Sequence, residues 1–177
     1  QYIRDAKIDS LYEGTTAIQA QDFFFRKIAK DQGGALMHVV AQLRQFLDDG
    51  AARPELAKGR ALLATALADV EDMVAAMTTF LMDSQQHPRE LYRLGLQSVP
   101  FLLAVGDLLL GWLLLQQAEI ALIAMDGDVG ERDRNFYTGK VAAALFFAKN
   151  VLPRLTSQSA ILRAVDLTAM ELPEGGF

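Results

Sequence analysis

The segment Glu13-Gly14-Thr15-Thr16 has the residue types from which a proton-transfer site could be built. Gly14 should break the chain and Thr15 or Thr16 should cap a new helix, so Glu13 is expected on a turn just before a helix N-terminus. Backbone N–H groups at such an end can bind a phosphate or polarise a carbonyl. A leucine and a tyrosine precede Glu13, and partial desolvation raises a carboxyl pKa towards values useful for proton transfer. These residues alone make Glu13 a candidate general base, with a surface carboxylate in a capping region as the alternative.

The rest of the chain must position this segment, and it is dominated by helical periodicity. Two apolar stripes with i, i+3, i+4, i+7 spacing predict helices; they are Leu36, Val39, Val40, Leu43, Phe46 and Leu47, and then Leu63, Ala66, Leu67, Val70, Met73, Val74, Met77, Phe80 and Leu81. Met73 and Met77 are expected in the core. No stretch of alternating apolar and polar residues predicts a strand.

Proline and glycine divide the second half of the chain. Pro100 suits the first turn of a helix, so a break before it is expected. Pro153 should end or kink a helix. The predicted segments are a short helix over 89–96, a helix over 100–125, a loop over 126–130, a helix over 133–152, a short helix near 161–165 and an extended tail over 173–177.

These elements predict an all-α fold, an up-and-down helical bundle preceded by a catalytic-loop and helix segment. We place the boundary between residues 1–31 and 32–177, next to Gly33-Gly34. The helix from Phe101 is apolar nearly all round and should be the most buried, with Gly106 and Gly111 allowing close approach of a neighbour. Polar residues interrupt it, so a bundle helix is favoured over a membrane span.

Several single residues have structural explanations. Asp107 lies in the apolar helix, and a buried unpaired charge is costly, so its expected partner is a lysine or a backbone group, with Lys140 and Lys149 as the candidate lysines. The aromatic run 23–25 is interpreted as packing rather than recognition of an acyl chain.

Composition excludes several classes of function. The formal charge of −5 and the scattered basic residues argue against nucleic-acid binding. The absence of cysteine excludes disulfides and thiolate metal sites, and two histidines are too few for a histidine-rich metal site, so no metal is expected. No signal peptide is evident, and the lack of an initiator Met suggests that the chain starts inside a longer protein. A cytoplasmic location fits the lack of cysteine.

Three motifs in the first thirty residues resemble the C-terminal signature of acyl-CoA dehydrogenases. They are Arg-Asp-Ala-Lys-Ile from Arg4, Tyr-Glu-Gly-Thr-Thr from Tyr12, and Ile-Gln at Ile18. The segments 136–140 and 148–153 are similar to the extra C-terminal domain of larger bacterial members. Residues 1–31 would then end the catalytic helical domain, and 32–177 would form the appended bundle.

The resemblance implies a reaction and roles for four residues. The family removes the α-proton of a fatty acyl-CoA thioester with a glutamate and passes the β-hydrogen as hydride to FAD, giving a trans-2-enoyl-CoA in fatty-acid β-oxidation. Glu13 matches the base, Gly14 the glycine that lines the substrate, and Thr15 and Thr16 the positions that contact FAD. Where relatives often carry Gln, this chain has Ala17.

The resemblance also implies partners and leaves alternatives. Electron-transfer flavoprotein would be the electron acceptor, in a homodimer or higher homo-oligomer of a bacterial cytoplasm. An acyl-CoA oxidase, which shares the base but is reoxidised by oxygen, is one alternative, and a non-catalytic helical assembly module is the other. The chain has no upstream flavin-binding segment, so it is not expected to hold FAD alone.

Overall fold

The computed structural model describes residues 2–8, 15–49 and 53–176, and these ranges contain helices and no β-strand, as the sequence predicts. The α-helices are α1 (Tyr2–Ile8), α2 (Thr16–Asp22), α3 (Gly34–Asp48), α4 (Ala57–Asp83), α5 (Glu90–Met125), α6 (Glu131–Asn150) and α7 (Arg154–Arg163). A π-helix η1 (Phe23–Ala29) continues α2, and short 3₁₀ turns are η3 (Pro54–Leu56), η4 (Thr168–Met170) and η5 (Glu174–Gly176).

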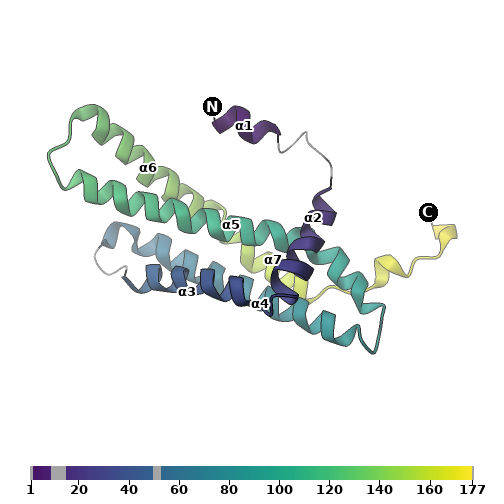
Figure 1. Ribbon diagram of the computed structural model, residues 1–177. Coiled ribbons are helices and arrows are strands. Elements are labelled where there is room, and N and C mark those ends of the chain that lie inside the picture. Colours follow the sequence, from purple (N-terminus) through teal and green to yellow (C-terminus); the bar gives the residue numbers. More distant parts are fainter. Residues whose placement is uncertain (1, 9–14, 50–52, 177) are drawn as a thin grey trace.

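The long helices form an up-and-down bundle, in which α3, α4, α5 and α6 share one long axis (Figure 1). Helix α5 packs against α2, α4, α6 and α7, so it is the central element of the bundle, although its outer apolar face is exposed rather than buried as predicted. Helix α2 and η1 cross one end of the bundle, and α1 lies away from it.

The two apolar stripes become the buried faces of α3 and α4. Val40, Leu43 and Phe46 are buried in α3. Met73 and Met77 are almost fully buried in α4, which confirms their prediction as core residues. At about 25 cal/mol per Å² of apolar surface removed from water, such faces supply the main favourable term for folding.

Helix α5 corrects the predicted break before Pro100. The structure has one continuous helix from Glu90 to Met125, with Pro100 inside it. Proline cannot donate an N–H to the carbonyl of Leu96, a loss of about 3 kcal/mol in a helix interior. Phe101 offsets this loss because it is fully buried, with its ring 5.9 Å from Phe23 and 6.1 Å from Phe24.

Among the described residues, α5 is the one helix long and apolar enough to cross a membrane by length and composition. Core helices of soluble proteins pass the same test. Phe101, Leu108 and Leu115 are buried by neighbouring helices, in keeping with the predicted bundle helix. Other large hydrophobic residues of α5 remain exposed; they are Leu91, Tyr92, Leu96, Leu103, Leu110, Leu113, Ile120 and Ile123.

The two glycines of α5 behave differently. A Cβ added at Gly111 would lie 2.8 Å from Cδ2 of Leu152, so Gly111 does allow close approach, as predicted. No atom lies within 4 Å of a Cβ added at Gly106, and the prediction of close packing there is wrong. A Cβ at Gly106 would meet open space, whereas one at Gly111 would meet the Leu152 side chain, which follows the end of α6.

We expect Gly111→Ala to lower the free energy of unfolding by about 1 kcal/mol net, because overpacking against Leu152 outweighs the gain in helix propensity. Gly106→Ala is the matched control on the same helix, and it should raise that free energy by about 0.5–1 kcal/mol. Urea unfolding followed by circular dichroism measures both. Equal shifts of the same sign would contradict the close contact at Gly111.

The prediction of a lysine partner for Asp107 is wrong. The half-buried Asp107 carboxyl has its pKa raised by burial, and the opposing cation is Arg154, at the start of α7. Lys140 instead donates to the side-chain oxygen of Gln117 at 3.0 Å. The sequence did not indicate Arg154 as the partner of Asp107, because Arg154 follows the turn at Pro153 and belongs to a different helix.

The buried side chain of Arg60 links α3, α4 and α5. From α4, its guanidinium donates to the carbonyl of Phe46 in the last turn of α3 and pairs with Glu119 of α5 at 2.7 Å. The guanidinium carbon also lies 4.0 Å from the Phe46 ring centroid. The last carbonyls of a helix lack partners within it, and a cation there is favourable, so Arg60 completes the end of α3.

Smaller differences occur towards the C-terminus. Helix α6 ends at Asn150, before the turn that contains Pro153, and α7 begins at Arg154. The tail predicted as extended contains the 3₁₀ turn η5. The described loop 126–130 is as predicted, and Arg53 donates to Asp126 there, which holds the pKa of that carboxyl below its usual range.

The predicted boundary between residues 31 and 32 remains a prediction. Gly33 adopts a left-handed conformation with φ of 77° at the N-cap position of α3, which gives a local break in the helix path. Phe24 and Ile28, upstream of this break, nevertheless belong to the same hydrophobic core as α4 and α5.

Candidate functional site

The start of α2 is the described part of the segment in which the sequence places chemistry. Glu13 and Gly14 lie outside the described residues. Thr15 occupies the N-cap position with φ −100° and ψ 24°, and its carbonyl accepts a hydrogen bond from the N–H of Gln19 at 2.9 Å. Thr16 is the first helical residue and is exposed. The predicted helix start is thereby confirmed, whereas the roles of the four residues remain predictions.

The N-terminal turn of α2 offers donors rather than acids or bases. The first N–H groups of a helix have no partner within it, and the helix dipole makes this end positive. The Thr15 side chain makes no capping hydrogen bond, and the Thr16 hydroxyl is exposed. These groups could therefore receive an anionic or carbonyl oxygen.

Burial on one face fixes α2 and η1 against the bundle. Ala20 and Phe24 are almost fully buried, and Ile28 is nearly so. The Phe24 ring meets the Phe101 ring edge to face, with an interplanar angle of 87°. The predicted packing role of the aromatic run is confirmed for Phe24. Because Thr16 is on the same continuous helix, this packing sets its position relative to α5.

The outer face of this helix is polar and solvent-exposed. Asp22 pairs with Arg26 one turn later at 3.0 Å. Ile18 is exposed although it is apolar. Arg4 and Asp5 are exposed on α1. No group of three His, Cys, Asp or Glu side chains suited to a metal ion occurs among the described residues.

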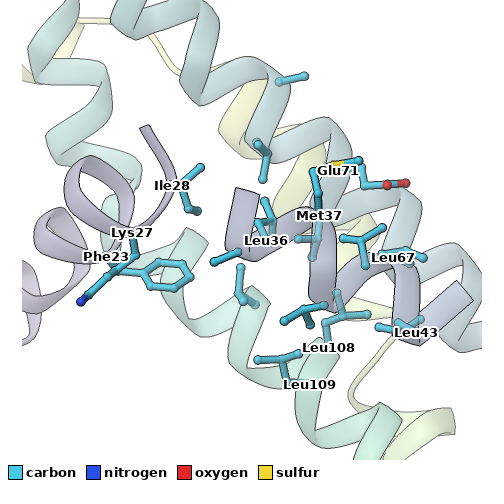
Figure 2. Close-up of a pocket in the computed structure, with 17 residues that line it drawn as sticks. Phe23, Lys27, Ile28, Leu36, Met37, Leu43, Leu67, Glu71, Leu108 and Leu109 are labelled. Atoms are coloured by element: carbon cyan, nitrogen blue, oxygen red, sulfur yellow. The ribbon is translucent and has the colours of Figure 1, made fainter. Parts of the chain in front are cut away.

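A cavity of about 380 Å³ lies between η1, α3, α4 and α5, and the sequence did not predict it. Its walls are almost wholly apolar; Figure 2 shows the Phe23 ring, Leu36 and Leu108 around it. The apolar spacing of α3 predicted a buried face, but spacing does not tell whether an opposing side chain fills the space. No signal in the sequence alone would have found this cavity.

The described chain is an all-α bundle preceded by a helix that packs against it. The chain belongs to the acyl-CoA dehydrogenase C-terminal family: the family model described as "Acetyl-CoA dehydrogenase C-terminal like" matches residues 39–173. The resemblance of the chain to acyl-CoA dehydrogenases is thus confirmed.

Individual relatives are acyl-CoA dehydrogenases by name. The chain is 58% identical over its whole length to the broad-specificity linear acyl-CoA dehydrogenase FadE5 of Mycobacterium tuberculosis. It is 32% identical over 97% of its length to a butyryl-CoA dehydrogenase of Syntrophomonas wolfei, and 33% identical over 89% to the 3-methylmercaptopropionyl-CoA dehydrogenase of Ruegeria pomeroyi. It spans 29%, 27% and 26% of these proteins.

Proposed function

We propose that the polypeptide to which this chain belongs dehydrogenates fatty acyl-CoA thioesters to trans-2-enoyl-CoA in fatty-acid β-oxidation. Two observations support the proposal: the sequence Glu13-Gly14-Thr15-Thr16, and the helix beginning at Thr16, which Ala20 and Phe24 dock onto α5. The names of the relatives support the acyl-CoA substrate class.

In this proposal Glu13 removes the α-proton and Gly14 lines the substrate. A carboxylate suits this task when partial desolvation brings its pKa closer to neutral pH. Oxidation of the α,β bond breaks two C–H bonds, so the proton needs a base and the β-hydrogen needs a hydride acceptor. Bound FAD would supply that acceptor.

The residues at the start of α2 fit part of an FAD site. Thr15 and Thr16 present hydroxyls, and the first-turn N–H groups form a positive end. These donors suit phosphate and ribityl oxygens. The remaining part of the flavin site would come from the upstream region of the polypeptide.

We also propose electron-transfer flavoprotein as the electron acceptor, a homodimer or higher homo-oligomer as the assembly, and the cytoplasm as the location. The exposed apolar residues of α5 support assembly, because apolar surface of this extent is commonly covered by a partner. No membrane span is part of the proposal.

Anaerobic mixing with acyl-CoA tests the proposed reaction. The polypeptide is prepared with the upstream region that the relatives have, loaded with FAD, and mixed with octanoyl-CoA or palmitoyl-CoA. We expect loss of the oxidised flavin absorbance and formation of the enoyl-CoA. An unchanged spectrum with both substrates would instead favour a non-catalytic assembly module.

Admitting oxygen then separates a dehydrogenase from an oxidase. A dehydrogenase should turn over rapidly only with electron-transfer flavoprotein or an artificial acceptor. Turnover with oxygen alone, accompanied by hydrogen peroxide, would assign the oxidase alternative while retaining the role of Glu13.

A further inference from the structure

The cavity between η1, α3, α4 and α5 is a pocket that opens to solvent rather than a closed void in the core. An apolar cavity of about 150 Å³ already accommodates benzene. This one measures about 380 Å³, within the range of about 300–1,000 Å³ of small-molecule sites.

The lining selects an apolar ligand. Fifteen of the seventeen lining residues carry apolar side chains, and the two exceptions are Lys27 and Glu71. A water molecule needs two to four polar partners, which these walls do not provide. Ala35, Met37 and Ala75 are exposed while they line the cavity, so the cavity meets solvent beside them.

Charge at the edges of the cavity sets the orientation of the ligand. Figure 2 shows the Lys27 ammonium and the Glu71 carboxylate at opposite edges, both pointing away from the apolar interior. Glu71 is neutralised by Arg44 at 2.6 Å. Lys27 is exposed, and it forms no ion pair with any of the described residues. Within the part of the chain that the structure describes, the Lys27 ammonium is therefore the one uncompensated charge at the edge of the apolar cavity.

From this arrangement we propose that the cavity binds one unbranched fatty carboxylate, with its chain among Leu36, Val74 and Leu108 and its carboxylate at Lys27. The site lies on the helical bundle and needs no flavin, so it does not rest on the proposed dehydrogenase activity. A free fatty acid is favoured over an acyl thioester because Lys27 offers a single cation to a small anionic head.

Calorimetric titration of the 177-residue chain with hexanoate, octanoate, decanoate and dodecanoate, each below its micelle concentration, tests the proposal. The dissociation constant should fall about fourfold for each methylene until the cavity is full. Binding should show a negative heat-capacity change, the marker of apolar burial. No detectable binding of dodecanoate would overturn the proposal.

Variants locate the ligand. Val74→Phe and Val39→Phe each place a ring in the cavity and should weaken decanoate binding at least tenfold, with helical content unchanged by circular dichroism. Val141→Phe, on α6 outside the cavity, is the matched control and should leave binding unchanged. Unchanged binding in both filled variants, or a change in sedimentation in place of binding, would overturn the assignment.

The head group is tested separately. Lys27→Gln should weaken decanoate about two- to fivefold, as expected for an exposed ion pair, and leave decanol unaffected. Lys30→Gln, three residues on and outside the cavity, should change neither. Tighter binding of decanoyl-CoA than of decanoate would overturn the assignment of a free carboxylate.

Discussion

Replacing Glu13 by Gln should slow flavin reduction by acyl-CoA about 100- to 10,000-fold, the range that a positioned general base contributes. Glutamine keeps the size and polarity of the side chain but cannot accept the proton. Stopped-flow absorbance of the FAD-loaded polypeptide with its upstream region measures the rate directly. The dissociation constant for octanoyl-CoA should change far less than the rate, because binding does not need the carboxylate.

Two comparisons make the Glu13 result specific. Asp22→Asn removes a carboxylate at the end of α2, where Asp22 pairs with Arg26, and should leave flavin reduction unchanged. Glu13→Asp should keep part of the activity because it retains a base with a shorter reach. A Glu13→Gln protein that reduces its flavin at the original rate would eliminate the proposed base.

The second large effect is expected at Glu119. Removing one partner of a buried ion pair leaves a charge without compensation, so Glu119→Gln should lower the free energy of unfolding by about 3 kcal/mol. The Arg60 side chain is 6% exposed and that of Glu119 24%, so water cannot replace the lost carboxylate fully. Chemical unfolding with urea gives the difference.

Glu71→Gln provides the control, because its pair with Arg44 has side chains 37% and 57% exposed. Its removal should cost less than about 1 kcal/mol. The double variant Arg60→Met with Glu119→Leu should be more stable than Glu119→Gln alone, since no buried charge remains. Equal losses at Glu119 and Glu71 would show that burial does not govern the Arg60 pair.

Local sequence patterns predicted most helices. They failed where contacts between residues far apart in the sequence determine the structure. The stripes ending at Leu47 and Leu81 fixed the faces of α3 and α4 because burial of a helix face follows a period of 3.6. The break before Pro100 failed because Phe101, packed on Phe23 and Phe24, stabilises the helix through a proline. The contact of Arg60 with Glu119 joins residues far apart in the sequence, which no local pattern encodes.

The candidate site was predictable to a similar degree. Capping preference placed a helix start at Thr15 or Thr16, and the structure has it there. The glycine turn at Gly14 and the carboxylate of Glu13 lie outside the described residues, so their geometry stays a prediction. The cavity needed the structure, because its volume depends on how α3 rests on α4 and α5 rather than on either sequence stripe.

Helix α5 passes Pro100 without a break, and this has a consequence for how the protein unfolds. A helix of this length spans about 54 Å at 1.5 Å per residue. Its first part holds Phe24 in place, and its last part packs against α6. Unfolding of either end would remove contacts that stabilise the same helix at its other end. The two ends should therefore unfold together as one cooperative unit.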